Sequence, residues 1–222
     1  MILTHAIRNN RASMTGRAPF LHKAGYSLLL FDFQAHGESE GETITFGDLE
    51  KDDVSAAIQF ASQRKPSNPI GLIGFSLGGV AAVLNGPALK IDALILEAVN
   101  SKLAHTVLNR IRQRVGPLAP ILAYPLLFQL QLQYGIDLKE LRPIDSIRSL
   151  DIPVFVIGGT RDQHTLPSET KALFAAANSP KELWLVKGAH HQDIHQFAPA
   201  DYETRLLAFL NAHLACASPM TK

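Results

Sequence analysis

Short, unbroken apolar segments recur along the chain and alternate with segments whose apolar residues have helical spacing. Buried strands of a parallel sheet carry unbroken apolar runs because both of their faces are covered. Four such runs predict interior strands, a mixed segment predicts a strand nearer a sheet edge, and the first residues predict a sixth strand. The predicted strands span residues 1–4, 26–33, 70–75, 93–99, 153–158 and 182–187.

Apolar residues at helical spacing predict three helices. The first follows Thr45 and Asp48, whose spacing resembles a capping box, and ends before Pro66. The second begins at Pro167, which suits a first helical turn, and the third lies near the C-terminus. Their apolar positions are Leu49, Val54, Ala57, Ile58 and Ala61; Leu173, Phe174 and Ala177; and Leu206, Leu207, Leu210 and Leu214.

The alternation of strands and helices predicts an α/β fold with a mostly parallel sheet of about six strands and helices on both faces. Functional residues are then expected where the strands end. Residues 102–150 interrupt the alternation, because they contain apolar residues and prolines but no convincing strand. We interpret them as a small helical cap inserted into a single domain that spans residues 1–222.

The composition indicates a soluble enzyme, because 46% of the 222 residues are hydrophobic and 18% are charged. With 21 basic and 20 acidic residues, the chain lacks the broad positive charge that binds nucleic acid or an anionic membrane. Small-molecule partners are therefore favoured. The single cysteine, Cys216, cannot form an internal disulfide, which fits a reducing compartment.

No apolar run reaches the ~18 residues of a membrane-spanning helix. The richest candidate, residues 117–133, is interrupted by Pro117, Pro120 and Pro125. The first residues show neither a charged region nor a long apolar run, so they do not predict a signal peptide. We therefore expect no transmembrane segment and a cytoplasmic location.

The strongest chemical signal is Gly-Phe-Ser-Leu-Gly at residues 74–78, between a predicted strand and a helix-compatible segment. A sharp strand-to-helix turn presents the Ser76 hydroxyl to solvent, and the flanking glycines avoid steric clashes in that turn. The amide of Leu77 and the helix N-terminus would stabilise a developing oxyanion. The alternative interpretation is an ordinary glycine-rich turn.

A serine nucleophile requires a histidine base and an acid that orients it. Asp162 follows the predicted strand 153–158, and His191 follows the next predicted strand. The order serine, aspartate, histidine and the two strand-end positions both agree with a Ser-His-Asp arrangement.

These residues resemble the alpha/beta-hydrolase superfamily, nearest to its bacterial serine esterase and acyl-peptidase-like branch, over nearly the whole sequence. Residues 31–39, Phe-Asp-Phe-Gln-Ala-His-Gly-Glu-Ser, resemble that branch's Asp-x-Arg-Gly-His-Gly-x-Ser segment, and residues 188–191 resemble its Gly-x-x-His ending. The resemblance implies that Ser76 is the nucleophile, Asp162 the acid and His191 the base. It implies no metal and no organic cofactor.

The sequence departs from the family pattern at three places. The family's His-Gly-x loop corresponds to His-Ala-Ile here, so Ala6 replaces a glycine beside Ile7, from which the second oxyanion amide is expected. Gln34 and Ala35 replace the usual Arg-Gly. The two strands that normally precede the first predicted strand are missing, so a minimal or truncated form is expected to expose a sheet edge and favour a homodimer.

A second hypothesis is a metal-dependent hydrolase, because imidazoles and carboxylates at close spacing are common zinc ligands. Its candidate ligands are His190, His191, Asp193 and His195. We otherwise interpret His190 as a solvent-exposed reserve base and His164 as a surface residue at the cleft. His36 is expected to brace its own turn.

The predicted activity is hydrolysis of an ester or related acyl bond through an acyl-enzyme. The third hypothesis is a catalytically impaired binding protein that keeps the fold. Arginines in the predicted cap are interpreted as solvated, and its apolar residues as packing onto the body and shaping a pocket for a lipophilic acyl group. These residues are Arg110, Arg112 and Arg114, and Leu122, Leu126, Leu127, Phe128, Leu130 and Leu132.

Overall fold

The computed structural model describes residues 1–135 and 137–214, and Cys216 therefore lies outside the described residues. Within these residues, six strands form one sheet in the order β2-β1-β3-β4-β5-β6, and every pair is parallel. The strands are β1 (Ile2–Thr4), β2 (Leu29–Leu30), β3 (Gly71–Phe75), β4 (Ala93–Glu97), β5 (Val154–Gly159) and β6 (Lys181–Val186). The predicted α/β fold is confirmed.

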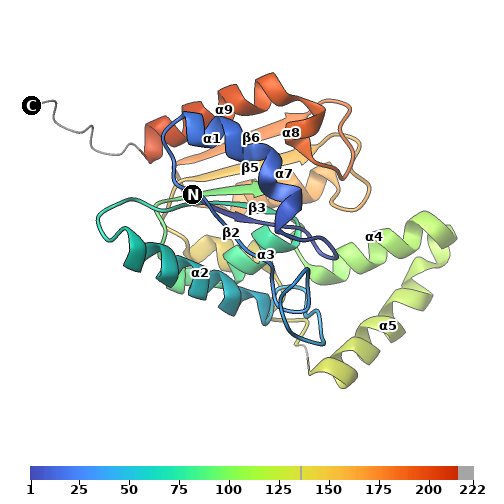
Figure 1. Ribbon diagram of the computed structural model, residues 1–222. Coiled ribbons are helices and arrows are strands. Elements are labelled where there is room, and N and C mark those ends of the chain that lie inside the picture. Colours follow the sequence, from blue (N-terminus) through green and yellow to red (C-terminus); the bar gives the residue numbers. More distant parts are fainter. Residues whose placement is uncertain (136, 215–222) are drawn as a thin grey trace, which may run out of the picture.

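Helices cover both faces of the sheet (Figure 1). Successive strand residues point to opposite faces, so Leu72 packs into one core and Ile73 into the other. One core lies under α2 (Glu50–Arg64), α3 (Leu77–Leu84) and α7 (Pro167–Ala176). The other lies under the 3-10 helix η1 (Arg11–Arg17), α1 (Ala18–Lys23), α8 (Ile194–Phe197) and α9 (Pro199–His213).

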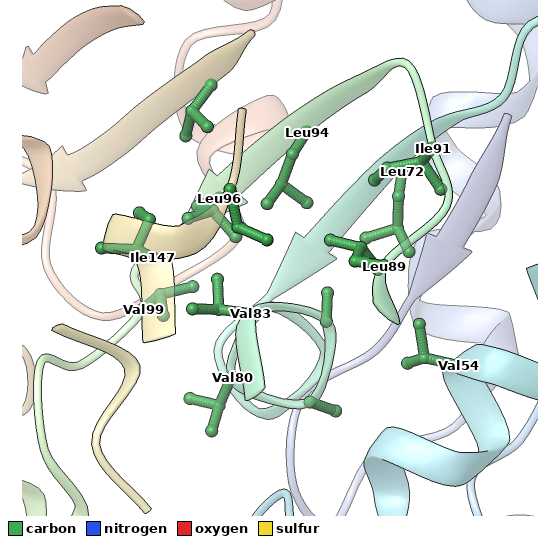
Figure 2. Close-up of a cluster of buried hydrophobic side chains, with 14 of the residues drawn as sticks. Val54, Leu72, Val80, Val83, Leu89, Ile91, Leu94, Leu96, Val99 and Ile147 are labelled. Atoms are coloured by element: carbon green, nitrogen blue, oxygen red, sulfur yellow. The ribbon is translucent and has the colours of Figure 1, made fainter. Parts of the chain in front are cut away.

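The helix that follows the Gly-Phe-Ser-Leu-Gly motif is anchored by apolar contacts. Figure 2 shows Val83 of α3 on the side of the helix that faces the strand residues Leu94 and Leu96, and all three side chains are buried. Burial of each such side chain stabilises the fold by about 1.5–3 kcal/mol. The N-terminus of α3 is thereby held against the ends of the central strands.

Two local predictions need correction. The predicted strand 26–33 shrinks to Leu29–Leu30, because β2 lies at the sheet edge and pairs only with the three-residue β1. The capping contact of Thr45 is made to Glu50 rather than Asp48: the Glu50 carboxylate accepts the Thr45 N–H at 2.8 Å. Asp48 instead pairs with Lys51.

A hollow of about 480 Å³ borders β2 and is lined partly by Leu29 and by Phe60 of α2. It lies at the sheet edge that the sequence predicted to be exposed. Dimerisation through this edge stays a prediction.

The segment between β4 and β5 is helical, as predicted. It contains α4 (Leu103–Val115), η3 (Gly116–Leu118), α5 (Ala119–Tyr134), α6 (Pro143–Ser146) and η4 (Ile147–Ser149). In Figure 1, α4 and α5 extend away from the sheet.

The expectation that this segment packs its apolar residues onto the body is wrong for most of α5. Only Ala119, Ala123 and Leu127 of α5 are buried among the described residues, and this stripe packs against α4. The exposed apolar side chains of α5 are Ile121, Leu122, Tyr124, Leu126, Phe128, Leu132 and Tyr134. The three buried residues follow one another at intervals of four and form a single narrow stripe along α5. The other faces of the helix therefore stay exposed.

Among the described residues, one helical stretch, Leu103–Tyr134, has the length and composition of a membrane span, and 17% of its most apolar window is buried. It joins α4 to α5 through Gly116, whose φ is +62°. Because α4 and α5 pack against each other, the stretch forms a hairpin rather than one straight rod.

Candidate active site

Ser76 occupies the turn between β3 and α3. Its φ of +50° and ψ of −110° are rarely adopted by residues other than glycine. A Cβ atom at Gly74 would lie 2.5 Å from Gly79, and one at Gly78 would lie 2.4 Å from the hydroxyl oxygen of Thr4. These two glycines are therefore needed for the close approach of β1, β3 and α3. The Ser76 N–H donates to the Glu97 carbonyl at 2.8 Å, which fixes the turn to β4.

Asp162 and His191 come from the loops after β5 and β6 and meet directly. His191 Nδ1 lies 2.8 Å from one carboxylate oxygen of Asp162. The other oxygen accepts the N–H groups of His164 and Thr165, both at 2.8 Å. Asp162 is buried, so three hydrogen bonds hold its carboxylate in one orientation and direct the imidazole of His191.

Ser76 and His191 line the same cavity of about 380 Å³. The ring of Phe75 stacks on that of His191 with a centroid distance of 5.9 Å. Ser76 Oγ makes no hydrogen bond within the described residues. The structure therefore places the predicted nucleophile and base on one cavity, without a direct hydrogen bond between them. Such contacts are often long before substrate binds.

The two predicted oxyanion donors lie beside Ser76. Ile7 and Leu77 line a second, smaller cavity of about 40 Å³ that also includes Ser76. Leu77 is the first residue of α3, so its N–H has no acceptor one turn earlier in the helix. The Ile7 N–H has no hydrogen-bond partner among the described residues. Ala6 has a negative φ, so its methyl group needs no strained backbone at the family's glycine position.

The loop at residues 31–39 is tied together despite its departures from the family pattern. Asp32 accepts the N–H groups of Arg11 and Glu38 at 2.6 and 3.0 Å, and pairs with the Arg11 guanidinium. Burial works to raise the pKa of Asp32, but these hydrogen bonds and the charge of Arg11 lower it. A Cβ at Gly37 would lie 2.2 Å from the Asp32 carboxylate, which explains the glycine there.

The substituted positions in this loop are also held by hydrogen bonds. Gln34 Nε2 donates to the Thr43 carbonyl at 2.9 Å. Ala35 has a φ of +56°, in the left-handed region that a glycine would adopt more easily. His36 Nδ1 lies 2.8 Å from the Gln34 carbonyl, so this histidine contacts its own turn, as expected.

A buried charge network behind the site has no counterpart in the sequence-based predictions. Arg17 Nη1 and Nη2 each lie 3.0 Å from an oxygen of Asp193, and Arg17 Nη2 also lies 2.6 Å from Glu97. Tyr202 donates its hydroxyl to Glu97, and burial raises the pKa of Tyr202 well above its usual value. The network joins the Ser76 turn, through Glu97, to the His191 loop, through Asp193.

The four residues of the metal hypothesis point to different partners. His191 contacts Asp162, Asp193 binds Arg17, and His195 Nε2 lies 2.9 Å from Glu203. His190 is exposed to solvent. In the part of the chain that the structure describes, no group of three or more His, Cys, Asp or Glu side chains has the arrangement of a metal site.

Two further residues line the cleft: His164, which the sequence predicted to be a surface residue at the cleft, and Arg110. The His164 ring lies 5.0 Å from the His191 ring, and both face the larger cavity. Burial and the nearby charge of His191 lower the pKa of His164. Arg110 lines both cavities beside Ser76, whereas Arg112 and Arg114 line neither. All three arginines are exposed, as the solvated interpretation expects, and Arg110 differs from the other two because it also lines the cavities beside Ser76.

Comparisons with known proteins agree with the fold. The family described as serine aminopeptidase, S33, matches residues 2–137. The structure of the Pyrococcus furiosus esterase Pf2001 is similar with a TM-score of 0.78 and 26% identity, covering 96% of this chain and 83% of that one. A monoacylglycerol lipase from Paleococcus ferrophilus shares the fold, with a TM-score of 0.68 and 18% identity over 95% and 93% of the two chains.

Two bacterial relatives are themselves uncharacterized proteins. YqkD of Bacillus subtilis is 26% identical over 86% of this chain, and YfhR of Salmonella typhimurium is 27% identical over 94%. The chain spans 64% of the length of the first and 71% of the length of the second.

Proposed function

The chain belongs to the serine aminopeptidase, S33, family within the alpha/beta-hydrolase superfamily, and from this premise we propose that it cleaves an ester or related acyl bond through an acyl-enzyme on Ser76. The observation that carries the proposal is the 2.8 Å contact between His191 and Asp162, on the cavity that Ser76 lines. The similarity to a solved esterase at 26% identity supports the ester as the bond cleaved.

In the proposed first step, His191 Nε2 takes the proton of Ser76 Oγ as that oxygen bonds to the substrate carbonyl carbon. The N–H groups of Leu77 and Ile7 stabilise the negative charge that forms on the carbonyl oxygen. His191 then gives its proton to the departing alcohol oxygen, and the acyl group stays on Ser76. Asp162 accepts the His191 Nδ1–H throughout, which keeps Nε2 free to act as the base.

In the second step, His191 takes a proton from water as the water oxygen attacks the acyl carbon. The tetrahedral intermediate collapses, the bond to Ser76 Oγ breaks, and His191 returns the proton to the serine. The products are an acid and an alcohol. Each atom and proton is supplied by the ester, the water molecule and these side chains.

The smaller cavity supports a short, lipophilic acyl group. Its apolar lining comes from Ile7, Phe46, Leu77, Val80, Leu103 and Leu141. This lining fits the sequence-based expectation of a lipophilic substrate, but its residues come from α3, α4 and loops rather than from α5. A volume of about 40 Å³ accommodates only a few carbon atoms, so we expect acetyl and butyryl esters to react faster than decanoyl esters.

Turnover of p-nitrophenyl acetate, butyrate and decanoate tests the proposal. Ser76→Ala is expected to lower kcat/KM by at least about 10³-fold, because the nucleophile is lost. The matched control is Ser62→Ala, since Ser62 is an exposed residue of α2, and it should retain wild-type turnover. Equal turnover in a folded Ser76→Ala protein would refute the assignment.

A further inference from the structure

Two exposed arginines near the candidate active site have no partner among the described residues, and only Arg110 lines its cavities. Arg110 projects from α4 and lines both cavities that contain Ser76. Arg8 directly follows Ile7, with a φ of +58° that is unusual for a residue other than glycine. Within residues 1–135 and 137–214, neither side chain has a hydrogen bond or an ion pair. By contrast, Arg11 and Arg17 both pair with carboxylates.

The surroundings disfavour the positive charge of Arg110. Although Arg110 is exposed, loss of part of its water contacts, and then the nearby charge of Arg8, lower its pKa. Arginine nevertheless stays protonated at neutral pH. A bound anion would offset both effects, because it would replace lost water contacts and neutralise the repulsion between the two cations.

No protein carboxylate supplies that anion. Asp193 is the only carboxylate among the described residues that line the two cavities. Both of its oxygens contact Arg17, at 3.0 Å each. Asp193 is therefore paired with Arg17, and no ion pair joins it to Arg110.

The position of Arg110 is specific to that residue. Arg110, Arg112 and Arg114 are all exposed on α4, but only Arg110 lines the two cavities. Successive helix residues are turned by about 100°, so Arg112 points roughly opposite to Arg110. Of these three arginines of α4, only Arg110 therefore reaches the cleft.

We propose that Arg110 binds a carboxylate or phosphate group of the substrate, next to the carbonyl group that reacts at Ser76. A planar guanidinium binds such groups through two parallel hydrogen bonds. The substrate would then be an amphiphilic ester, with a short apolar acyl portion in the small cavity and an anionic group at its rim. This inference rests on the proposed function.

Two matched pairs of esters test the proposal kinetically and distinguish the side of the ester that carries the charge. For the leaving group, 4-acetoxybenzoate is compared with its neutral methyl ester. For the acyl group, mono-p-nitrophenyl succinate is compared with p-nitrophenyl butyrate. The quantity measured is the ratio of kcat/KM for the anionic ester to that for the neutral one, in wild type, Arg110→Gln and Arg112→Gln.

In Arg110→Gln, we expect this ratio to fall about tenfold for at least one pair, because a charged hydrogen-bond partner is lost. Arg112→Gln should keep the wild-type ratio. Differences in intrinsic ester reactivity cancel, since each variant is measured with the same esters. A ratio unchanged by Arg110→Gln in both pairs overturns the proposal, while Ser76-dependent turnover would still support the hydrolase.

Calorimetric titration tests the anion site without requiring turnover. The products 4-hydroxybenzoate and succinate are titrated into the wild type and Arg110→Gln, with 4-hydroxybenzamide as the neutral control. At least one anion should bind the variant about tenfold more weakly, and the amide should bind both proteins equally. If no ester is hydrolysed, the proposed function fails. If the wild type and Arg110→Gln bind 4-hydroxybenzoate equally and succinate equally, the anion site is overturned, whatever the outcome for hydrolysis.

Discussion

Arg17 Nη2 lies 2.6 Å from Glu97 Oε2, and neither side chain is exposed to solvent. Two further groups, Asp193 and Tyr202, complete the environment of the guanidinium. Removing one member of a buried ion pair leaves its partner charged without compensation, which is costly because the partner has lost its water.

Arg17→Met is therefore expected to lower the free energy of unfolding by about 3–5 kcal/mol. Urea denaturation measures the change. The control is Arg11→Met, because Arg11 pairs with Asp32 and Glu38 but its side chain is 42% exposed, so the loss should be much smaller. Equal stability of Arg17→Met and the wild type would contradict the role given to the buried network.

Asp162→Asn should separate catalysis from folding. Asparagine Oδ1 can still accept the His164 and Thr165 N–H groups, so the loop should keep its conformation. Its amide nitrogen cannot accept the His191 Nδ1–H, which favours the wrong tautomer of the base. We expect kcat to fall about 10³–10⁴-fold, with little change in Tm. A variant with unaltered kcat would show that Asp162 does not orient the base.

Stability should decrease as the pH falls below about 6.5, partly because of His5. His5 is buried, and its Nε2 accepts the Phe33 N–H at 3.1 Å, which requires the neutral imidazole. The pKa of His5 is lowered, chiefly by burial. The hydrogen bond to the Ala6 carbonyl works to raise this pKa, and the charge of His36 lowers it further. As the pH falls, the unfolded chain therefore takes up the proton before the folded one does, and folding loses free energy.

The pH effect is measured as the slope of the free energy of unfolding against pH, between pH 7 and 5. The slope should be shallower in His5→Gln than in the wild type. His22→Gln, at an exposed position of α1, serves as the control. An unchanged slope in His5→Gln would contradict the interpretation.

Neighbouring leucines of α5 should respond very differently to truncation. Leu127 is 4% exposed and Leu126 is 41% exposed. Leu127→Ala is expected to lower the local stability of α5 by about 2 kcal/mol, because it removes packing against α4. Leu126→Ala should change it by less than about 0.5 kcal/mol. Amide hydrogen exchange of α5 measures both effects, and equal losses at the two positions would show that the helix packs differently.

The central strands were predictable because their burial leaves a direct mark on the sequence. The predicted run 70–75 became Gly71–Phe75, and 153–158 became Val154–Gly159. The positions of Asp162 and His191 also followed from local order, since both lie in loops after neighbouring strands. The edge strand β2 has no such constraint, and its predicted length was wrong.

Long-range contacts had no local signal. Arg17 is 80 residues from Glu97 and 185 residues from Tyr202, and neither contact follows from periodicity or a motif. The exposure of α5 was not predicted, because an apolar sequence favours burial but does not indicate which part of the molecule would cover the helix. The orientation of Arg110 depends in the same way on how α4 meets the cleft.

The central claim is that Ser76 is an activated nucleophile. Labelling with a fluorophosphonate probe, followed by mass spectrometry of the modified peptide, tests it without assuming a substrate. We predict that the label is found on Ser76, and that heat denaturation or His191→Ala abolishes it, because the serine requires its base. A folded protein that takes no label at Ser76 would contradict the claim and favour a hydrolase-fold protein that only binds its ligand.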